Sequence, residues 1–354
     1  MGFFSKRKAV VGLDIGSSVI KAVELRPKKG GTFELVSLAA EELAPEAIVD
    51  GTILDSELVT ETIAKLFKEH KIKNADVATS VSGNAVIIKK IQLPLMNEDE
   101  LAESIQWEAE QYIPFDIEDV NIDYQILGDP HGSGAENMDV LLVAAKKDKI
   151  NDYTSVIQRA GKHPVVVDVD AFAVQNAFEA NYDISGSEVV ALINAGASIM
   201  NINILKNGNT IFWRDISVGG NKYTEELQKE LHLSQEQAEA LKKGLPVEGA
   251  SSAQAQPILD QVSQEVGQEI QKTFDFFIAT SNTDRIDRIA LAGGCAKVAN
   301  LDQILQDRFG TRIELINPFE RIEVNSKLFD PEFVASLGAS AVVAVGLALR
   351  GVGE

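Results

Sequence analysis

Residues 12–18 read GLDIGSS and carry side chains suited to binding phosphate. A turn of small residues aims successive backbone N–H groups into one concavity, which accommodates phosphate oxygens. Ser17 and Ser18 add hydroxyl donors, and Lys21 can supply a positive charge. Asp14 could hold Mg²⁺ through water, because that ion keeps much of its hydration shell. The alternative is an ordinary glycine hairpin in which Asp14 caps the turn.

Two further small-residue turns lie in the second half of the chain. The segment NAGAS occupies the equivalent place in a second strand–turn–strand pattern and contains Asn194, Gly196, Ala197 and Ser198. The segment LAGGC ends a strand-like run before a helix and contains Gly293 and Gly294. A glycine pair there lets the backbone approach a ribose or a phosphate closely. By itself, the last segment would be a plain strand-to-helix turn.

The elements that must position these turns follow from hydrophobic periodicity. Residues 9–39 and 188–218 share one pattern of strands and glycine turns, and such a duplication predicts two related lobes. We expect helices over 56–70 with Ser56 as N-cap, over 97–112 with an Asn97–Glu100 capping box, and over 149–161. Later helices are expected over 220–244, over 258–281 after a Ser/Ala/Gln linker at 249–256, and over 335–349.

The composition excludes several classes of protein. The 354 residues include 33 Lys and Arg against 53 Asp and Glu, and the net charge of −20 disfavours nucleic-acid binding. The single Cys295 excludes an intramolecular disulfide framework and a cysteine-based zinc site. The start, MGFFSKRK, has no apolar core and is not a signal peptide, and 335–349 is shorter than the ~20 residues of a membrane helix. We expect a reducing, cytoplasmic compartment.

The order and spacing of the three turns resemble those of the actin-like ATPase superfamily, which includes actin, hexokinase and Hsp70-type chaperones. The resemblance covers nearly the whole chain. The turns match in GLDIGSSVIK, INAGAS and ALAGGCAKV, and two connecting helices match in DVDAFAVQNAF and LGASAVVAVGLAL. It implies an α/β, bilobed actin-like fold with duplicated ribonuclease-H-like lobes, and ATP with Mg²⁺ between them.

The resemblance also implies roles for particular residues. Asp14 and Asn194 would hold Mg²⁺ through water, but relatives carry Asp where Asn194 stands, and an amide contributes no charge. Asp168 matches the position of the water-activating residue, with Asp170 as a rival that could instead cap the following helix. The segments GGNKYTEEL and AEALKK resemble a nucleotide-contacting helix pair. The implied ATP-binding set is Gly16, Ser17, Ser18, Lys21, Asn194, Gly196, Ala197, Ser198, Gly219, Gly220, Glu239, Lys242, Gly293 and Gly294.

One branch of the superfamily fits best. Residues 85–162 resemble the insert domain of FtsA-like proteins, and WEAEQYIPFDIEDVNIDYQIL is similar to a segment typical of the PilM family of type IV pilus assembly. The expected division places the first lobe at 1–84, 163–185 and 330–354, the second lobe at 186–218 and 258–329, and its smaller subdomain at 219–257.

This resemblance implies a protein partner, the N-terminal cytoplasmic peptide of PilN, in a groove between the first lobe and the insert. It also implies other pilus platform proteins, and attachment to the bacterial inner membrane only through partners, since the amphipathic membrane helix of FtsA-type relatives has no counterpart here. Trp107 lies off the apolar stripe of its helix, where an aromatic side chain either anchors a partner or packs against the neighbouring lobe. The candidate groove residues are Trp107, Tyr112, Ile113, Pro114 and Phe115.

The function predicted is a nucleotide-binding scaffold with weak or no ATPase activity. Bound ATP would fix the orientation of the lobes, and that orientation would set the partner groove. One alternative is an FtsA-like protein that self-associates into filaments, which sedimentation with ATP would distinguish. Another is a small-molecule kinase, which would need a substrate pocket with a placed base.

Overall fold

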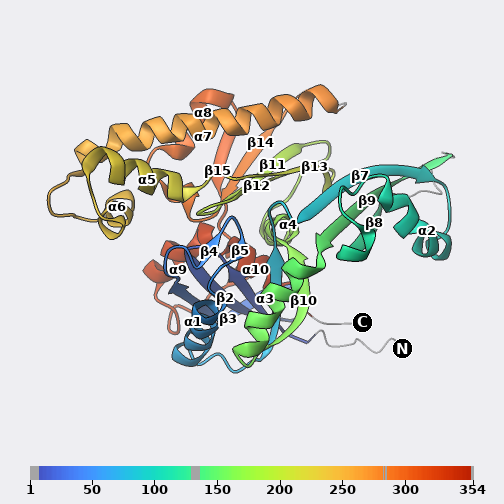
Figure 1. The fold of residues 1–354 in the computed structure, drawn as a ribbon, viewed down its shortest axis with the longest axis horizontal. Coiled ribbons are helices and arrows are strands. Elements are labelled where there is room, and N and C mark those ends of the chain that lie inside the picture. Colours follow the sequence, from blue (N-terminus) through green and yellow to red (C-terminus); the bar gives the residue numbers. More distant parts are fainter. Residues whose placement is uncertain (1–7, 129–135, 282, 284, 352–354) are drawn as a thin grey trace.

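The computed structural model describes residues 8–128, 136–281, 283 and 285–351. Two sheets share one design, in which an antiparallel meander of three strands continues into two parallel strands (Figure 1). The first has the order β10-β6-β1-β2-β3-β16 and the second β13-β12-β11-β14-β15. The first contains β1 (Val11–Ile15), β2 (Val19–Pro27), β3 (Phe33–Glu42), β6 (Asp76–Val81), β10 (His163–Val169) and β16 (Ile322–Glu323); the second contains β11 (Val189–Ala195), β12 (Met200–Lys206), β13 (Asn209–Ile216), β14 (Arg288–Ala292) and β15 (Arg312–Leu315).

A third, antiparallel sheet extends to the side of the two lobes (Figure 1). Its order is β7-β9-β8, from β7 (Val86–Pro94), β9 (Asn137–Lys146) and β8 (Val120–Leu127). Helix α2 (Glu98–Glu110) covers one face, where Val140 and Leu142 join its core. Because side chains alternate along a strand, Leu141 and Val143 lie on the opposite face. Between β8 and β9 the sequence GDPHGSGAEN predicts a turn-rich loop, most of which, at 129–135, lies outside the described residues.

Two helices, α4 (Asp170–Asn181) and α10 (Val342–Ala348), bury their side chains in one core shared by both lobes. Their backbones approach closely, since an ideal Cβ on Gly346 would lie 1.7 Å from the Ala173 carbonyl oxygen. Every residue of α10 is buried. Residues 331–348 are apolar and long enough to be a candidate membrane span, but this burial is that of a core helix.

The remaining helices cover the outer faces of the two large sheets. Helices α1 (Ser56–Glu69) and α3 (Lys147–Arg159) pack on the first sheet, although α3 follows the last strand of the third. Helices α5 (Gly220–Leu231), α7 (Ser252–Thr280) and α8 (Leu301–Phe309) pack on the second. The other elements are β4 (Ile48–Val49), β5 (Thr52–Ile53), α6 (Gln235–Lys242), α9 (Pro331–Leu337) and the 3-10 turns η1 (Ile117–Asp119), η2 (Cys295–Lys297) and η3 (Gly338–Ala341).

Several helix boundaries differ from the sequence prediction. The N-cap of α1 is Asp55, whose side chain accepts from Leu58 N, so Ser56 as the cap was wrong. The linker at 249–256 was also wrong, because α7 begins at Ser252. The helix expected over 220–244 breaks at His232, which adopts a left-handed conformation. The helix expected over 335–349 is split by η3. The Asn97–Glu100 capping box is confirmed.

Candidate functional site

The turns that follow β1 and β11 meet at the boundary between the two lobes. The hydroxyl oxygens of Ser17 and Ser198 lie 2.8 Å apart. Each turn is too tight for a side chain at its glycine: an ideal Cβ on Gly16 would lie 2.9 Å from a carbonyl oxygen of its own turn, and one on Gly196 2.7 Å. The structure therefore brings the first two predicted phosphate loops into direct contact.

Asp14 and Lys21 form an ion pair beside the first loop. They are cross-strand neighbours on β1 and β2, and Lys21 Nζ lies 2.9 Å from Asp14 Oδ2. Both side chains are largely buried. Ser18 is exposed at the tip of the turn. The lysine charge is thus held next to the loop and not extended into solvent.

The start of α5 is fastened to the second loop by its backbone. Gly220 N donates to the Gly196 carbonyl at 2.9 Å, and Asn221 N donates to that of Ala197 at 2.8 Å. An ideal Cβ on Gly219 would lie 2.5 Å from both of those carbonyl oxygens. The predicted glycine pair at 219–220 therefore allows the helix to sit directly on the loop.

Lys242 and Glu239 on α6 form an internal cluster with α5. Lys242 Nζ donates to Glu239 Oε1 at 2.5 Å, to Thr224 Oγ1 at 2.8 Å and to the Gly220 carbonyl at 3.0 Å. Burial opposes ionisation of Glu239, but the charge and hydrogen bond of Lys242 outweigh it and lower the pKa of Glu239. Both residues lie beside the second loop, and the ammonium group is already fully engaged.

The third glycine turn also reaches the second loop. Gly293 has φ +91° and an ideal Cβ there would lie 2.2 Å from the Ala195 carbonyl oxygen, so only glycine fits. Gly293 N donates to the Ala339 carbonyl at 2.7 Å. Gly294 has open space where a side chain would be. Cys295, expected to be a small packing residue, is buried, and burial raises its pKa to about 12.

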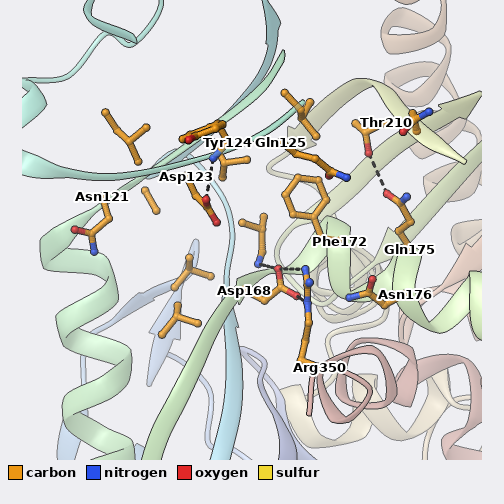
Figure 2. A pocket seen from close by; sticks show the side chains of 18 of the residues that line it. Asn121, Asp123, Tyr124, Gln125, Asp168, Phe172, Gln175, Asn176, Thr210 and Arg350 are labelled. Atoms are coloured by element: carbon orange, nitrogen blue, oxygen red, sulfur yellow. Dashed lines mark hydrogen bonds and ion pairs between the residues drawn. The ribbon is translucent and has the colours of Figure 1, made fainter. Parts of the chain in front are cut away.

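The two candidate bases point to different places. Asp170, at the start of α4, accepts a hydrogen bond from Ser80 Oγ at 2.5 Å, and burial together with the charge of Asp14 raises its pKa. Asp168 accepts from Arg350 Nε at 2.5 Å and from Arg350 Nη2 at 3.1 Å, inside a separate cavity (Figure 2). Asp170 therefore lies within electrostatic reach of Asp14 beside the first loop, whereas Asp168 is engaged by Arg350 in the cavity.

The residues around the loops offer oxygen ligands of the kind Mg²⁺ prefers. Burial raises the pKa of Asp170, the nearby charge of Asp14 raises it further, and a cation would relieve that repulsion. Asn194 is 9% exposed and donates its Nδ2 to Asn201 Oδ1 at 2.9 Å, which leaves its own oxygen free of partners among the described residues. Those residues contain no group of three or more His, Cys, Asp or Glu able to hold a metal. The donor set therefore fits a hydrated Mg²⁺ that takes further ligands from phosphate.

A cavity of about 590 Å³ lies between the third sheet, the first lobe and the β12–β13 hairpin (Figure 2). One wall comes from β8 and from the face of β9 that carries Leu141 and Val143. The opposite wall comes from the end of β10 and the first turns of α4, with Phe172 and Gln175. Gln175 Oε1 accepts from Thr210 Oγ1 of the second lobe at 3.0 Å. The third sheet, the first lobe and the second lobe therefore all contribute side chains to one cavity.

The predicted groove residues lie elsewhere. Trp107 is 73% exposed on α2, and Ile113 is buried in the core under that helix. Tyr112, Pro114 and Phe115 follow α2 on the same side of the third sheet, with Tyr112 and Phe115 packed against its core. The cavity lies on the other side of that sheet and none of the five residues lines it. The five predicted groove residues therefore lie apart from the cavity.

Sequence reasoning missed most residues of the cavity wall. The signal available was the alternation along β8, where Asn121, Asp123 and Gln125 occupy every second position. That alternation predicts a strand with one polar face. Nothing local connects β8 with Arg350, which reaches the cavity from the far end of the chain.

The chain resembles the same group of proteins in sequence and in structure. The family model described as type IV pilus assembly protein PilM matches residues 12–352. Cell division protein FtsA of Streptococcus pneumoniae serotype 2 (strain D39 / NCTC 7466) is 23% identical over 391 residues, which cover 99% of this chain and 83% of that protein.

Two solved structures illustrate the range of structural likeness. A chain of a PilM-PilN type IV pilus biogenesis complex superposes with a TM-score of 0.87 and 29% identity, covering 99% of this chain and 100% of that one. MreB5 of Spiroplasma citri bound to ADP has a TM-score of 0.55 and 14% identity, covering 97% and 95%. These likenesses confirm the predicted bilobed, actin-like architecture with two duplicated lobes.

Proposed function

The chain belongs to the type IV pilus assembly protein PilM family and has a role in that assembly, and on this premise we propose that it is a nucleotide-binding scaffold for PilN. The N-terminal cytoplasmic peptide of PilN would occupy the cavity between the third sheet and the first lobe. ATP with Mg²⁺ would occupy the cleft at the phosphate loops. The protein would then stay on the cytoplasmic side of the inner membrane through PilN.

The observation that carries the PilN site is that both walls of the cavity include the edge of a sheet. Within the described residues β8 pairs only with β9, and β10 pairs only with β6. An extended peptide can add to such an edge through backbone hydrogen bonds, while pockets between the strands select its side chains. The protein in the similar complex is paired with PilN, which supports the same partner here.

The nucleotide site is supported by the convergence of the three glycine turns. Ser17 and Ser198 touch, Gly219 and Gly293 lie against the second loop, and Gly294 borders open space. MreB5, a protein of the same fold, is bound to ADP in its structure. Asn194 supplies no charge to the metal, so we propose slow hydrolysis or none.

Helix α4 gives a route by which nucleotide could set the shape of the cavity. Asp170 at its first residue is within electrostatic reach of Asp14 beside the first loop, while Phe172 and Gln175 line the cavity within the next two turns. At about 1.5 Å per residue, the two sites are separated by less than 10 Å along one helix. A change in lobe orientation at the loops would therefore move the cavity wall.

The test is isothermal titration calorimetry with a synthetic N-terminal PilN peptide from the same organism. Gln125 is exposed and lines the cavity, so Gln125→Trp should narrow it without disturbing the fold and weaken binding at least about tenfold. Trp107→Ala is the matched variant on the other side of the third sheet and should leave the affinity unchanged. The opposite pattern would place the peptide beside Trp107, one of the predicted groove residues, and not in the cavity. An unchanged affinity in both variants would refute both sites.

The nucleotide half is tested separately, by titrating ATP into the protein with Mg²⁺ present and with EDTA. Asp14→Ala should weaken binding in Mg²⁺, since it removes one of the two carboxylates at the loops. Absence of ATP binding by the wild-type protein would refute the nucleotide proposal and leave the peptide proposal standing.

A further inference from the structure

Three polar side chains form a row of hydrogen bonds across the second sheet. Asn194 on β11 is the cross-strand neighbour of Asn201 on β12, which is in turn the neighbour of Asp215 on β13. Asn194 Nδ2 donates to Asn201 Oδ1 at 2.9 Å, and Asn201 Nδ2 donates to Asp215 Oδ1 at 2.7 Å. Asp215 Oδ2 accepts from the backbone N of Gly83 at 2.6 Å. The row therefore runs from the second phosphate loop to the end of β6 in the first lobe.

The direction of this row is fixed at the Asp215 end. Burial raises the pKa of Asp215 to about 7, and above that pH its ionised carboxylate only accepts hydrogen bonds, whereas an asparagine amide has one accepting and one donating end. Because Asp215 accepts from Gly83 N–H and from Asn201, the amide of Asn201 must present its oxygen to Asn194. Asn194 must then donate its NH₂ group inward, and its own oxygen is left for the loop.

We infer that Asp215 is a positioning residue, which makes Asn194 present an oxygen and not an NH₂ group to the cation at the second phosphate loop. This inference rests on the proposed nucleotide site. A cation accepts an oxygen ligand, directly or through water, but is repelled by an N–H donor. Asp215 itself would touch neither nucleotide nor metal.

The substitution Asp215→Asn should reverse the whole row. The Gly83 N–H still needs an acceptor, so the new amide turns its oxygen toward Gly83 and its NH₂ group toward Asn201. Asn201 then turns over to accept, and its NH₂ group faces Asn194. Asn194 must accept in turn, which leaves its NH₂ group facing the loop.

A double variant provides the matched control. In Asn201→Asp combined with Asp215→Asn, the carboxylate moves one strand inward and accepts from both neighbours. The amide on β13 still offers its oxygen to Gly83 N–H. Asn194 therefore keeps its original orientation, while net charge and side-chain volume are almost unchanged. The two variants therefore differ in the direction of the row and by one negative charge, and the exchange of the Asn194 amide reports the direction alone.

The experiment has one readout without nucleotide and one with it. The full-length protein is labelled with ¹⁵N-asparagine and kept at about pH 8, where Asp215 is ionised. The Asn194 side-chain amide is assigned by its loss in Asn194→Ala. It should exchange with solvent slowly in wild type and in the double variant. It should exchange at least about tenfold faster in Asp215→Asn. Equal exchange in wild type and Asp215→Asn would overturn the inference.

The second readout is the gain in ATP affinity that Mg²⁺ confers, measured by calorimetry against EDTA. Asp215→Asn should lose about tenfold or more of that gain, the usual effect of removing a partner that orients a metal ligand. The double variant should keep the gain within twofold. Loss of the Mg²⁺-dependent gain in both variants would overturn the inference. The effect would then follow from any substitution in the row and not from the direction of its hydrogen bonds. If wild type binds no ATP, the nucleotide proposal fails, and amide exchange alone tests the direction of the row.

Discussion

Adding one methyl group where α4 and α10 cross should destabilise the protein strongly. An ideal Cβ on Gly346 would lie 1.7 Å from the Ala173 carbonyl oxygen, whereas ordinary contact begins at 3.4 Å. To reach ordinary contact, the two helices would have to move apart by about another 1.7 Å. The obstacle is the backbone of a buried helix and not the end of a flexible side chain, so no local shift can relieve it.

The magnitude follows from two opposing effects. Replacing glycine by alanine within a helix contributes up to about 1 kcal/mol of stability. Overpacking a core costs typically about 1–3 kcal/mol and more where the surroundings cannot adjust. Separation by 1 Å or more also weakens dispersion contacts along the whole interface. We therefore expect Gly346→Ala to lower the free energy of unfolding by at least about 2 kcal/mol.

The assay is urea unfolding followed by circular dichroism, with Gly267→Ala as the matched helical control. At Gly267 the Cβ would meet Arg308 Nε at 2.8 Å, and a long side chain can move aside. That variant should stay within about 1 kcal/mol of wild type. If Gly346→Ala proved as stable as Gly267→Ala, the close approach of α4 and α10 would be refuted.

Three further predictions concern single side chains. Burial raises the pKa of Cys295 to about 12, so a thiol reagent at pH 8 should react at least about a hundredfold more slowly with folded than with urea-unfolded protein. Burial raises the pKa of Asp215 to about 7, so the folded state binds this proton more tightly than the unfolded chain. The free energy of unfolding of wild type minus that of Asp215→Asn should therefore be highest below pH 4 and fall by up to about 1.4 kcal/mol per pH unit toward pH 7. Urea titrations measure this difference, and a difference that does not change with pH would contradict the prediction. Asn97→Ala removes one half of a capping box and should cost about 1 kcal/mol in the same assay, whereas Asn121→Ala, on an exposed strand position, should cost less than half as much.

Much of the fold could be predicted because its signals are local. The capping box at Asn97 and Glu100 needs only residues three apart. The duplicated strand–turn–strand pattern is also readable along the chain, and it corresponds to the shared order of the two large sheets. The cap of α1 was misassigned because Asp55 and Ser56 are both good N-caps, and sequence does not decide between neighbours.

The sites were harder to predict because they depend on register and on which face of a sheet is covered. The row from Asn194 to Asp215 exists only because three strands pair with those residues opposite one another. Arg350 and Asp168 meet across 182 positions of sequence. The helix that carries Trp107 was identified from the sequence, but the side of the third sheet that α2 covers is a tertiary property.

Two sheet edges, those of β8 and β10, have no further strand beside them among the described residues, and this also bears on how the protein avoids self-association. An open sheet edge is a template for aggregation, and native proteins cover it, charge it or shorten it. Here both edges contribute to the walls of one cavity, and β8 carries Asp123 there. A single extended chain, which needs about 4.8 Å beside its neighbour, can enter such a space, but the edge of another folded sheet cannot. The geometry that would admit one peptide thus also excludes sheet-to-sheet pairing at these two edges.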